Sequence, residues 1–299
     1  MPPGIGPHGG RGARWVRFTG LESVAGSEET HMKAETSSSS NEALVTRSQT
    51  GALVTLSLNR GDRFNPLSLS MIAALEGELD SIAADTTVRV VILRGEGRGF
   101  CAGHDLREMR EHAADGEWQR QLFESCNRMM IKLTQLPQPV IARVHGIATA
   151  AGCQLVSMCD IAIAEEGAKF AMPGVNIGVF CSTPAVGVAR NIGRKRSMEM
   201  LLTGDEIGAA QALDWGLVNR VVAADRLDAE VAGFAERILK RSGAAIAIGK
   251  RSFYEQLECG MPGAYEIAGR AMVRNVLLAD AVEGMDAFLK KREPAWRNT

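Results

Sequence analysis

The chain has 299 residues, of which 45% are hydrophobic and 23% charged, and its formal net charge at pH 7 is −1. That length suffices for one large domain or two small ones, and the near-neutral charge gives no general attraction to nucleic acid or anionic membranes. No apolar run approaches the roughly 20 residues that span a bilayer. The six cysteines have no metal-ligand spacing, so we expect free thiols, a reducing compartment and no metal site.

Residues 1–48 are predicted to be a disordered or targeting extension before a folded domain at residues 49–299. The first 20 residues are rich in Gly, Pro and Arg and have neither a helical nor a strand period. Three arginines before the first acidic residue are a feature of mitochondrial transit peptides. Met32 is an alternative start, which would make the preceding residues an upstream extension. A cytoplasmic location is expected, with the mitochondrial matrix as the alternative.

The first half of the domain alternates strands and helices. Ala52–Asn59 alternates apolar and polar residues, as a half-buried strand does, and Ser68 is a helix N-cap for the run that ends near Asp85. Val88–Leu93 is a nearly continuous β-branched run, typical of a strand buried on both faces. A glycine-rich loop, a helix, a strand, a small-residue turn that opens a helix, and two strands follow in order: Gly95–Asp105, Trp118–Leu136, Pro139–Val144, Gly146–Gly152, Asp160–Ala164 and Lys169–Met172.

The rest of the chain is predicted to be mostly helical. Its elements, with one strand at Leu217–Val222, are Pro184–Asn191, Arg194–Leu202, Gly208–Trp215, Leu217–Val222, Leu227–Ser242, Ala244–Glu258 and Ala264–Leu289. Strands that alternate with helices predict crossover connections, and therefore an α/β fold with a helical C-terminal third. No internal repeat or linker is evident after residue 50, which favours one domain.

Two loops that follow predicted buried strands offer free backbone amides. In the first, GFCAGHD at residues 99–105, small residues let another molecule approach, and the amide of His104 lies near a helix start, where donors lack helical acceptors. The second, HGIATAAGCQ at residues 145–154, opens a helix with the amides of Ala151 and Gly152 at its positive end. Two such amides that converge on one carbonyl oxygen would form an oxyanion hole.

The order and spacing of six segments resemble the crotonase (enoyl-CoA hydratase/isomerase) superfamily over about residues 50–297. These segments are NRGDRFNPLS (59–68), GFCAGHDL (99–106), VHGIATAAGCQLVSMCDIAIA (144–164), FAMPGVNIG (170–178), LLTGDEIGAAQALDWGLVNRVV (201–222) and FLKKREPAW (288–296). The resemblance implies a crotonase-like (ClpP/crotonase) fold, with a β-β-α spiral core and a helical C-terminal trimerisation region. It also implies trimers or hexamers, a coenzyme A thioester as substrate or ligand, a link to fatty-acid metabolism, and no separate cofactor.

The resemblance assigns roles to the residues that match the family's motifs. It implies that the amides of His104 and Ala151 form the oxyanion hole, and that Arg63 and Phe64 lie along the adenine and pantetheine of CoA. Arg107 lies where the family often has a lysine near the nucleotide phosphates, and a solvated helix-face charge is the other interpretation. The substrate tunnel is expected to be lined by Ala102, Gly103, Asp105, Leu106, Ala148, Gly152 and Pro173.

The catalytic acids of the family's hydratases are missing. Hydration uses two glutamates as general acid and base, and Gln154 and Gly174 occupy their positions here. A third acidic position, found in the dienoyl isomerase branch, carries Ser182. The imidazole of His104 and the thiol of Cys181 are candidate replacements, against a role for His104 as backbone donor only and for Cys181 as a buried inert thiol.

Two functions therefore remain open. The chain is either an enzyme of the hydratase/isomerase family whose reaction does not need the glutamate pair, or a non-catalytic acyl-CoA-binding homologue. The acyl group and the reaction are not readable from the sequence.

Overall fold

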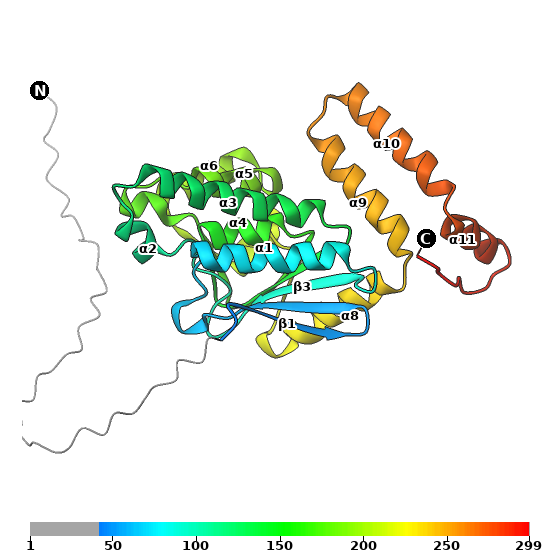
Figure 1. Cartoon of the computed structure of the whole chain (residues 1–299), viewed down its shortest axis with the longest axis horizontal. Coiled ribbons are helices and arrows are strands. Elements are labelled where there is room, and N and C mark those ends of the chain that lie inside the picture. Colours follow the sequence, from blue (N-terminus) through cyan, green and yellow to red (C-terminus); the bar gives the residue numbers. More distant parts are fainter. Residues whose placement is uncertain (1–41, 299) are drawn as a thin grey trace, which may run out of the picture. The chain divides into compact units, whose positions relative to one another are not determined.

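The computed structural model describes residues 42–298 and contains a six-stranded sheet (Figure 1). The strands run in the order β1 (Val45–Thr50), β2 (Leu53–Leu58), β3 (Val90–Gly95), β4 (Val140–Val144), β6 (Ile161–Glu165) and β9 (Arg220–Val222). β1 pairs antiparallel with β2, and all later neighbours are parallel. Parallel neighbours need crossover connections, and the helices between these strands provide them.

A second sheet of three short strands lies next to the chain's small-residue turns. It has the order β5 (Ile147–Thr149), β7 (Lys169–Ala171) and β8 (Glu206–Gly208). β5 lies inside Gly146–Gly152, which the sequence predicts to be a turn, and β8 is not predicted. Such three-residue strands carry too few side chains to set a period, and the pairing of Ala148 with Phe170 forms only in the folded chain.

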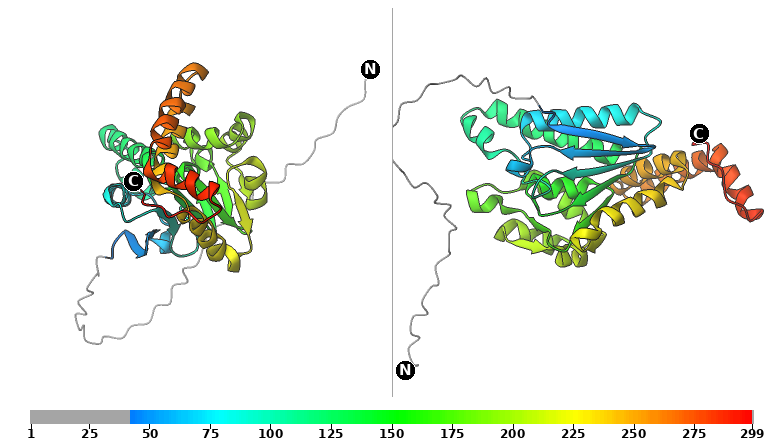
Figure 2. Two further views of the ribbon diagram at one scale, coloured as in Figure 1. Left: turned by 90° about the vertical axis from the view of Figure 1, so that its right-hand side faces the viewer. Right: turned by 90° about the horizontal axis from the view of Figure 1, so that it is seen from below.

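The helices cover both faces of the six-stranded sheet, as Figures 1 and 2 show. Side chains of β3 alternate between two cores: Val91 and Leu93 face one, and Val90 and Ile92 face the other, beneath α8. The helical elements are η1 (Gly61–Arg63), α1 (Leu69–Ala84), α2 (Leu106–Glu111), α3 (Gly116–Gln135), α4 (Ala151–Met158), η2 (Pro173–Ile177), α5 (Ser182–Asn191), α6 (Arg194–Thr203), α7 (Ala209–Trp215), η3 (Ala224–Arg226), α8 (Leu227–Leu239), α9 (Gly243–Leu257), α10 (Met261–Val276) and α11 (Ala279–Leu289).

Two features of the described unit differ from the sequence-based expectation. Strand β1 is not predicted, and it begins before the expected domain boundary at residue 49 and runs across it; the compact unit begins at Glu42. The rest of the predicted extension, up to residue 41, lies outside the described residues. The helix predicted at Ala264–Leu289 is two helices, because Leu278 adopts an extended conformation between α10 and α11.

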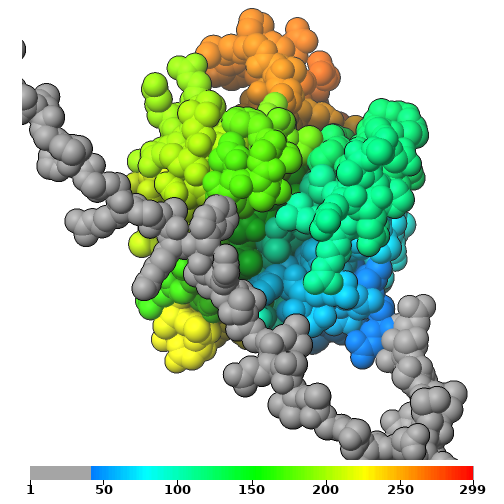
Figure 3. All heavy atoms as spheres, turned by 90° about the vertical axis from the view of Figure 1, so that its left-hand side faces the viewer, coloured from blue at the N-terminus to red at the C-terminus, as the bar shows by residue number. Residues whose placement is uncertain are grey.

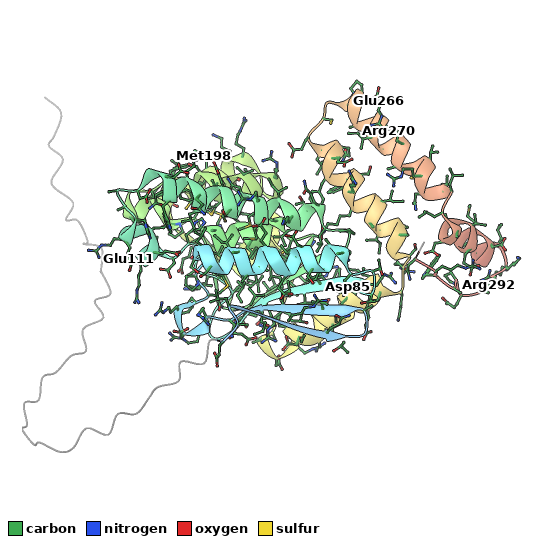
Figure 4. The ribbon with its side chains drawn as sticks, in the orientation of Figure 1. Asp85, Glu111, Met198, Glu266, Arg270 and Arg292 are labelled. Atoms are coloured by element: carbon green, nitrogen blue, oxygen red, sulfur yellow. The ribbon has the colours of Figure 1, made fainter. Side chains whose placement is uncertain are left out.

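The break before α11 allows a buried carboxylate to hold the C-terminal tail. Asp280, in the first turn of α11, accepts hydrogen bonds from Ser242 Oγ (2.6 Å), Arg297 N (2.7 Å) and Asn298 N (3.0 Å). Arg292 pairs with Glu283 in the same segment, and Figure 4 shows Arg292 beside α11. Polar contacts of this kind leave no periodic signal, so the sequence does not reveal them.

Helix α9 is attached to the core by a buried ion pair. Lys250 Nζ donates to Asp160 Oδ2 (2.7 Å) and to the carbonyl oxygens of Leu133 (2.8 Å) and Gln138 (3.0 Å). Tyr254 Oη donates to the other oxygen of Asp160 (3.0 Å). Burial lowers the pKa of Lys250, and Asp160 opposes that shift. All three ammonium protons have acceptors, so the cluster joins the C-terminal helices to the end of α3 and the start of β4.

We predict that Lys250→Met lowers the free energy of unfolding by about 3–5 kcal/mol, because it leaves the Asp160 carboxylate buried without its cation. Denaturant titration followed by circular dichroism measures the change. Lys169→Met is the matched control: its pair with Glu206 is about half exposed, so its loss is expected to cost less than about 1 kcal/mol. Equal losses in the two variants would contradict the anchoring role of Lys250.

Candidate functional site

The two loops with free amides lie at the carboxyl ends of central strands in the six-stranded sheet. They follow the neighbouring parallel strands β3 and β4, and the carboxyl ends of such strands are where α/β folds place ligands. Cys101 in the first loop pairs with Ala148 in the second: Cys101 N donates to Ile147 O (3.1 Å), and Thr149 N donates to Cys101 O (3.0 Å). Thr149 Oγ1 also donates to Ala102 O (3.0 Å). The structure thus joins the two loops through their backbones.

The amide of His104 is turned away from Leu67 by the hydrogen bonds of its neighbours. Leu67 N donates to Gly103 O (2.7 Å), and Asp105 N donates to Leu67 O (3.3 Å). In a parallel bridge of this kind the residue between the two bonded groups directs its own N–H away from the partner strand. No acceptor for the His104 amide lies within residues 42–298.

The amide of Ala151 is directed by a strained residue before it. Ala150 has φ 49° and ψ −119°, a conformation that costs on the order of 1–3 kcal/mol for a residue with a Cβ. Ala150 N is occupied by Ala171 O (2.9 Å), whereas the described chain contains no acceptor for the amide of Ala151, the first residue of α4. Strain of this kind is typical of sites where the backbone serves a ligand.

The two free amides lie close together. A Cβ placed on Gly103 would lie 3.2 Å from Ala151 N and 3.0 Å from Thr149 O, and Gly103 has φ 93°. A Cβ on Gly152 would overlap the carbonyl of Cys101. Glycine is therefore required at both positions, because the loops leave no room for a side chain between them. Two convergent N–H donors at a helix N-terminus can stabilise one anionic oxygen.

The two positions where the resemblance expects glutamates, Gln154 and Gly174, are both buried. Gln154 is 3% exposed, and its Oε1 has no hydrogen-bond partner among the described residues. Gly174 is buried, and a Cβ there would lie 2.8 Å from Cys181 Sγ and overlap the carbonyl oxygen of Val179. The chain between Val179 and Cys181 thus occupies the space that a glutamate at position 174 would need.

The two candidate replacement groups are both held neutral. Burial lowers the pKa of His104 to about 4, its Nε2 has no partner in the described chain, and its ring packs edge-on against Phe123 (5.3 Å between centroids). Burial raises the pKa of the Cys181 thiol, although the amide of Gly174 opposes the shift. Neither group is poised to exchange a proton near pH 7.

A cleft of about 490 Å³ opens beside the first loop. It is lined by Leu44, Arg60, Arg63, Pro66, Ser68, Ser70, Asp105, Arg107, Glu108 and Glu111. Figure 3 shows α2 beside the first strands on this face, and Figure 4 labels Glu111 at the end of α2. Arg63, Asp105 and Arg107 were expected near a ligand, whereas Arg60 was not singled out, because an arginine after a strand carries no signal of its own.

The cleft's acidic residues also have structural roles. Asp105 caps α2 by accepting hydrogen bonds from Arg107 N (2.9 Å) and Glu108 N (3.4 Å). Glu108 Oε2 accepts from Leu69 N (2.9 Å) and so holds α2 against the start of α1. Backbone donors thus engage Asp105 and Glu108, and Glu111 is a third carboxylate in the cleft beside the three arginines.

The other predicted ligand-contacting residues differ in exposure. Phe64 lies under the guanidinium of Arg98 (4.9 Å to the ring centroid), and its carbonyl accepts from Ala102 N (2.9 Å). Leu106 is 55% exposed, and Pro173 is the first residue of η2. Ala148 is fully buried, so its part in the site is the backbone pairing with Cys101.

Residues 48–299 match the family described as enoyl-CoA hydratase/isomerase. The chain therefore belongs to this family, and its crotonase-like fold is confirmed.

Among residues 42–298 no group of three or more His, Cys, Asp or Glu side chains is placed to hold a metal ion. No helix in that range is long and apolar enough to cross a membrane.

Several relatives share most of the chain. A structure of enoyl-CoA hydratase from Mycobacterium smegmatis is 48% identical, with a TM-score of 0.84 over 85% of this chain and 99% of that one. The human enoyl Coenzyme A hydratase domain-containing protein 3 is 40% identical, with a TM-score of 0.82 over 85% of this chain and 100% of that one. Its mitochondrial homologue in Danio rerio is 42% identical over 88% of this chain and 90% of the relative. Similarity to domain-containing protein 3 agrees with the motifs GHDL, ATAAGCQL, PGVN and CSTP.

We predict that Gly174→Ala destabilises the protein by about 1–3 kcal/mol, because the new methyl group meets the carbonyl of Val179 and the sulfur of Cys181. Gly77→Ala is the control: Gly77 lies within α1 with nothing within 4 Å of the new Cβ, so the change is expected to stabilise by about 0.5–1 kcal/mol. Thermal and denaturant unfolding measure both. A neutral Gly174→Ala would show that the space for a glutamate is open after all.

Proposed function

We propose that this chain binds acyl-CoA thioesters, with the thioester carbonyl oxygen between the amides of His104 and Ala151. The observation that carries the proposal is the pair of adjacent backbone amides that have no acceptor within the described chain. A free donor in a buried loop costs stability unless a ligand or water accepts its proton. Membership in the enoyl-CoA hydratase/isomerase family supports a thioester as that ligand.

The nucleotide half of CoA is proposed to lie in the 490 Å³ cleft next to this loop. Arg60, Arg63 and Arg107 bring three cationic groups to it, and guanidinium groups are well suited to phosphate. The Phe64 ring, in the same loop as Arg63, supplies an apolar surface for the adenine or pantetheine. The proposal requires no metal and no cofactor besides the CoA thioester itself.

Hydration by two glutamates is not part of the proposed function. Gln154 can orient a water molecule but cannot accept its proton, and the packing around Gly174 leaves no room for a carboxylate. A second candidate function is catalysis by the oxyanion hole alone, as in enolate formation or thioester hydrolysis. The strained backbone at Ala150 favours this candidate, because a site that serves only for binding has less reason to keep a costly amide geometry.

The wild-type protein is expected to bind crotonyl-CoA with no hydration above background. Calorimetry measures the binding, and loss of absorbance of the enoyl thioester measures turnover. Ala151→Pro replaces the amide proton with a ring carbon at the oxyanion position, and is expected to weaken thioester binding by about 10-fold or more while free CoA binds as before. Fast hydration by the wild type would overturn the proposal, and an unchanged thioester affinity in Ala151→Pro would refute the oxyanion assignment.

We also propose that the chain self-associates as a trimer, or as a hexamer of paired trimers, through its C-terminal helices. Nine large apolar side chains on α10, α11 and their connection are more than half exposed, which is unusual for a surface that faces only water. They are Met261, Tyr265, Met272, Val273, Leu277, Val282, Met285, Phe288 and Leu289. Figure 4 shows α10 and α11 with Glu266 and Arg270 labelled on α10.

Phe288→Asp is expected to shift the assembly toward the monomer, because it places a charge on a side chain that is 82% exposed in the single chain and buried in the proposed assembly. Sedimentation velocity measures the mass. Thr46→Asp adds a charge on the exposed edge strand β1 and is expected to leave the assembly intact. A monomeric wild type, or an unchanged Phe288→Asp assembly, would contradict this surface.

The compartment is a further proposal. Several relatives carry "mitochondrial" in their names, which favours the matrix over the cytoplasm as the place where this chain meets acyl-CoA.

A further inference from the structure

Asn65 is a fully buried polar side chain in the loop of residues 59–68, called here the cleft loop. It contacts the loop of residues 99–105, called here the oxyanion loop. Its Oδ1 accepts a hydrogen bond from Arg60 N (2.8 Å). Its Nδ2 lies within hydrogen-bonding distance of the carbonyl oxygens of Glu96 (2.9 Å), Gly99 (2.9 Å) and Phe100 (3.1 Å). One amide group therefore binds two backbone segments that are more than 30 residues apart in sequence.

The segment around Asn65 runs along the oxyanion loop and forms hydrogen bonds with it on both sides of His104. Phe64 O accepts from Ala102 N (2.9 Å), and Leu67 bonds to the residues on either side of His104. These contacts fix the backbone of the loop just before the His104 amide. The direction of that amide therefore depends on where the segment from Arg60 to Leu67 is held.

The backbone of this segment is itself strained. Phe64 and Asn65 both have left-handed conformations, with φ 60° and 52°. Two consecutive left-handed residues with side chains are unfavourable, and such a conformation persists only when the surrounding contacts over-determine it. The four contacts of the Asn65 side-chain amide hold this conformation together with backbone hydrogen bonds, among them Asn65 N to Arg60 O (2.9 Å) and Ala102 N to Phe64 O (2.9 Å).

We propose that Asn65 is a positioning residue for the oxyanion hole: its side-chain amide sets the Gly99–His104 backbone so that the His104 amide points at the thioester oxygen. This inference rests on the proposed thioester binding. The Oδ1 atom of Asn65 also accepts a hydrogen bond from Arg60 N. The side chain therefore links the oxyanion loop to the loop that brings Arg60 and Arg63 to the cleft. Asn65 touches neither the thioester nor the nucleotide in this proposal; it acts through the backbone.

Two variants separate positioning from general packing. Asn65→Ala removes all four contacts. Asn65→Asp keeps the size of the side chain and the acceptor for Arg60 N, but it turns a second oxygen toward three carbonyl oxygens. A carboxylate in that place has a raised pKa, because burial and the carbonyl dipoles disfavour its charge. Once protonated, its O–H can donate to one of the carbonyls. Asn59→Ala is the matched control, since Asn59 bonds to Ala43 O (2.9 Å) and not to the oxyanion loop.

The experiment compares butyryl-CoA with S-butyl-CoA, the thioether that lacks the carbonyl oxygen, by calorimetry on the full-length chain. The ratio of the two dissociation constants isolates the oxyanion contribution from the nucleotide contribution. The wild type and Asn59→Ala are expected to prefer the thioester about 3- to 10-fold, and Asn65→Ala is expected to lose that preference. In Asn65→Asp the preference is expected to be absent at about pH 8 and to return in part at about pH 5.5.

An infrared measurement on bound butyryl-CoA with a ¹³C-labelled carbonyl gives a second readout. Hydrogen bonding to the carbonyl lowers its stretching frequency, so the wild type is expected to show a lower frequency than free ligand, and Asn65→Ala a frequency closer to that of free ligand.

The outcomes distinguish the two proposals. A wild type with no preference for the thioester would overturn thioester binding in the oxyanion hole itself. A wild type with that preference, together with an Asn65→Ala variant that keeps it, would overturn the role of Asn65 alone. An equal weakening of both ligands, or loss of folding in both Asn65 variants at about 10 °C, would assign Asn65 to the core fold and likewise overturn the positioning role.

Discussion

A backbone amide can be kept free for a ligand only when the groups around it are paired, and the site of this protein depends on that constraint. The carbonyl before His104 and the amide after it are both bonded to Leu67, and the amide before Ala151 is bonded to Ala171. The amides of His104 and Ala151 thus remain free because the neighbouring backbone groups already have hydrogen-bond partners. Buried backbone groups without partners are costly, so this arrangement is stable only as part of a surface that a ligand or water completes.

The positions at which proton-transfer groups were expected carry neutral residues. Gln154 is buried and its Oε1 has no hydrogen-bond partner among residues 42–298, His104 is neutral through burial, and Gly174 is closed in by the chain that leads to α5. At position 174 the backbone itself is an obstacle, because an added Cβ would overlap the carbonyl of Val179. Stabilisation of a carbonyl oxygen and proton transfer are separable parts of thioester chemistry, and the two free amides concern only the first.

Sequence patterns located most of the regular elements, because the spacing of apolar residues distinguishes long amphipathic helices from β-branched strands. Ser68, for example, caps α1 through its bond to Met71 N (3.1 Å), as an N-cap serine should. The short strands β5 and β8 and the break at Leu278 were missed, since three-residue strands and a single extended residue carry no period. Arg60 and Asn65 were not singled out for the site, because neither has a motif of its own; their importance comes from what lies beside them.

The sequence by itself determined the family, the two small-residue loops and the absence of both glutamates, because these depend only on which residues occur and in what order. The tertiary structure decided whether the two amides meet, whether their donors are free, and whether a carboxylate could return at Gly174. Those properties depend on distances between segments that are far apart along the chain, such as Gly103 to Ala151 and Gly174 to Val179. Chain order cannot fix such distances, because they are set by the packing of the whole sheet and its helices.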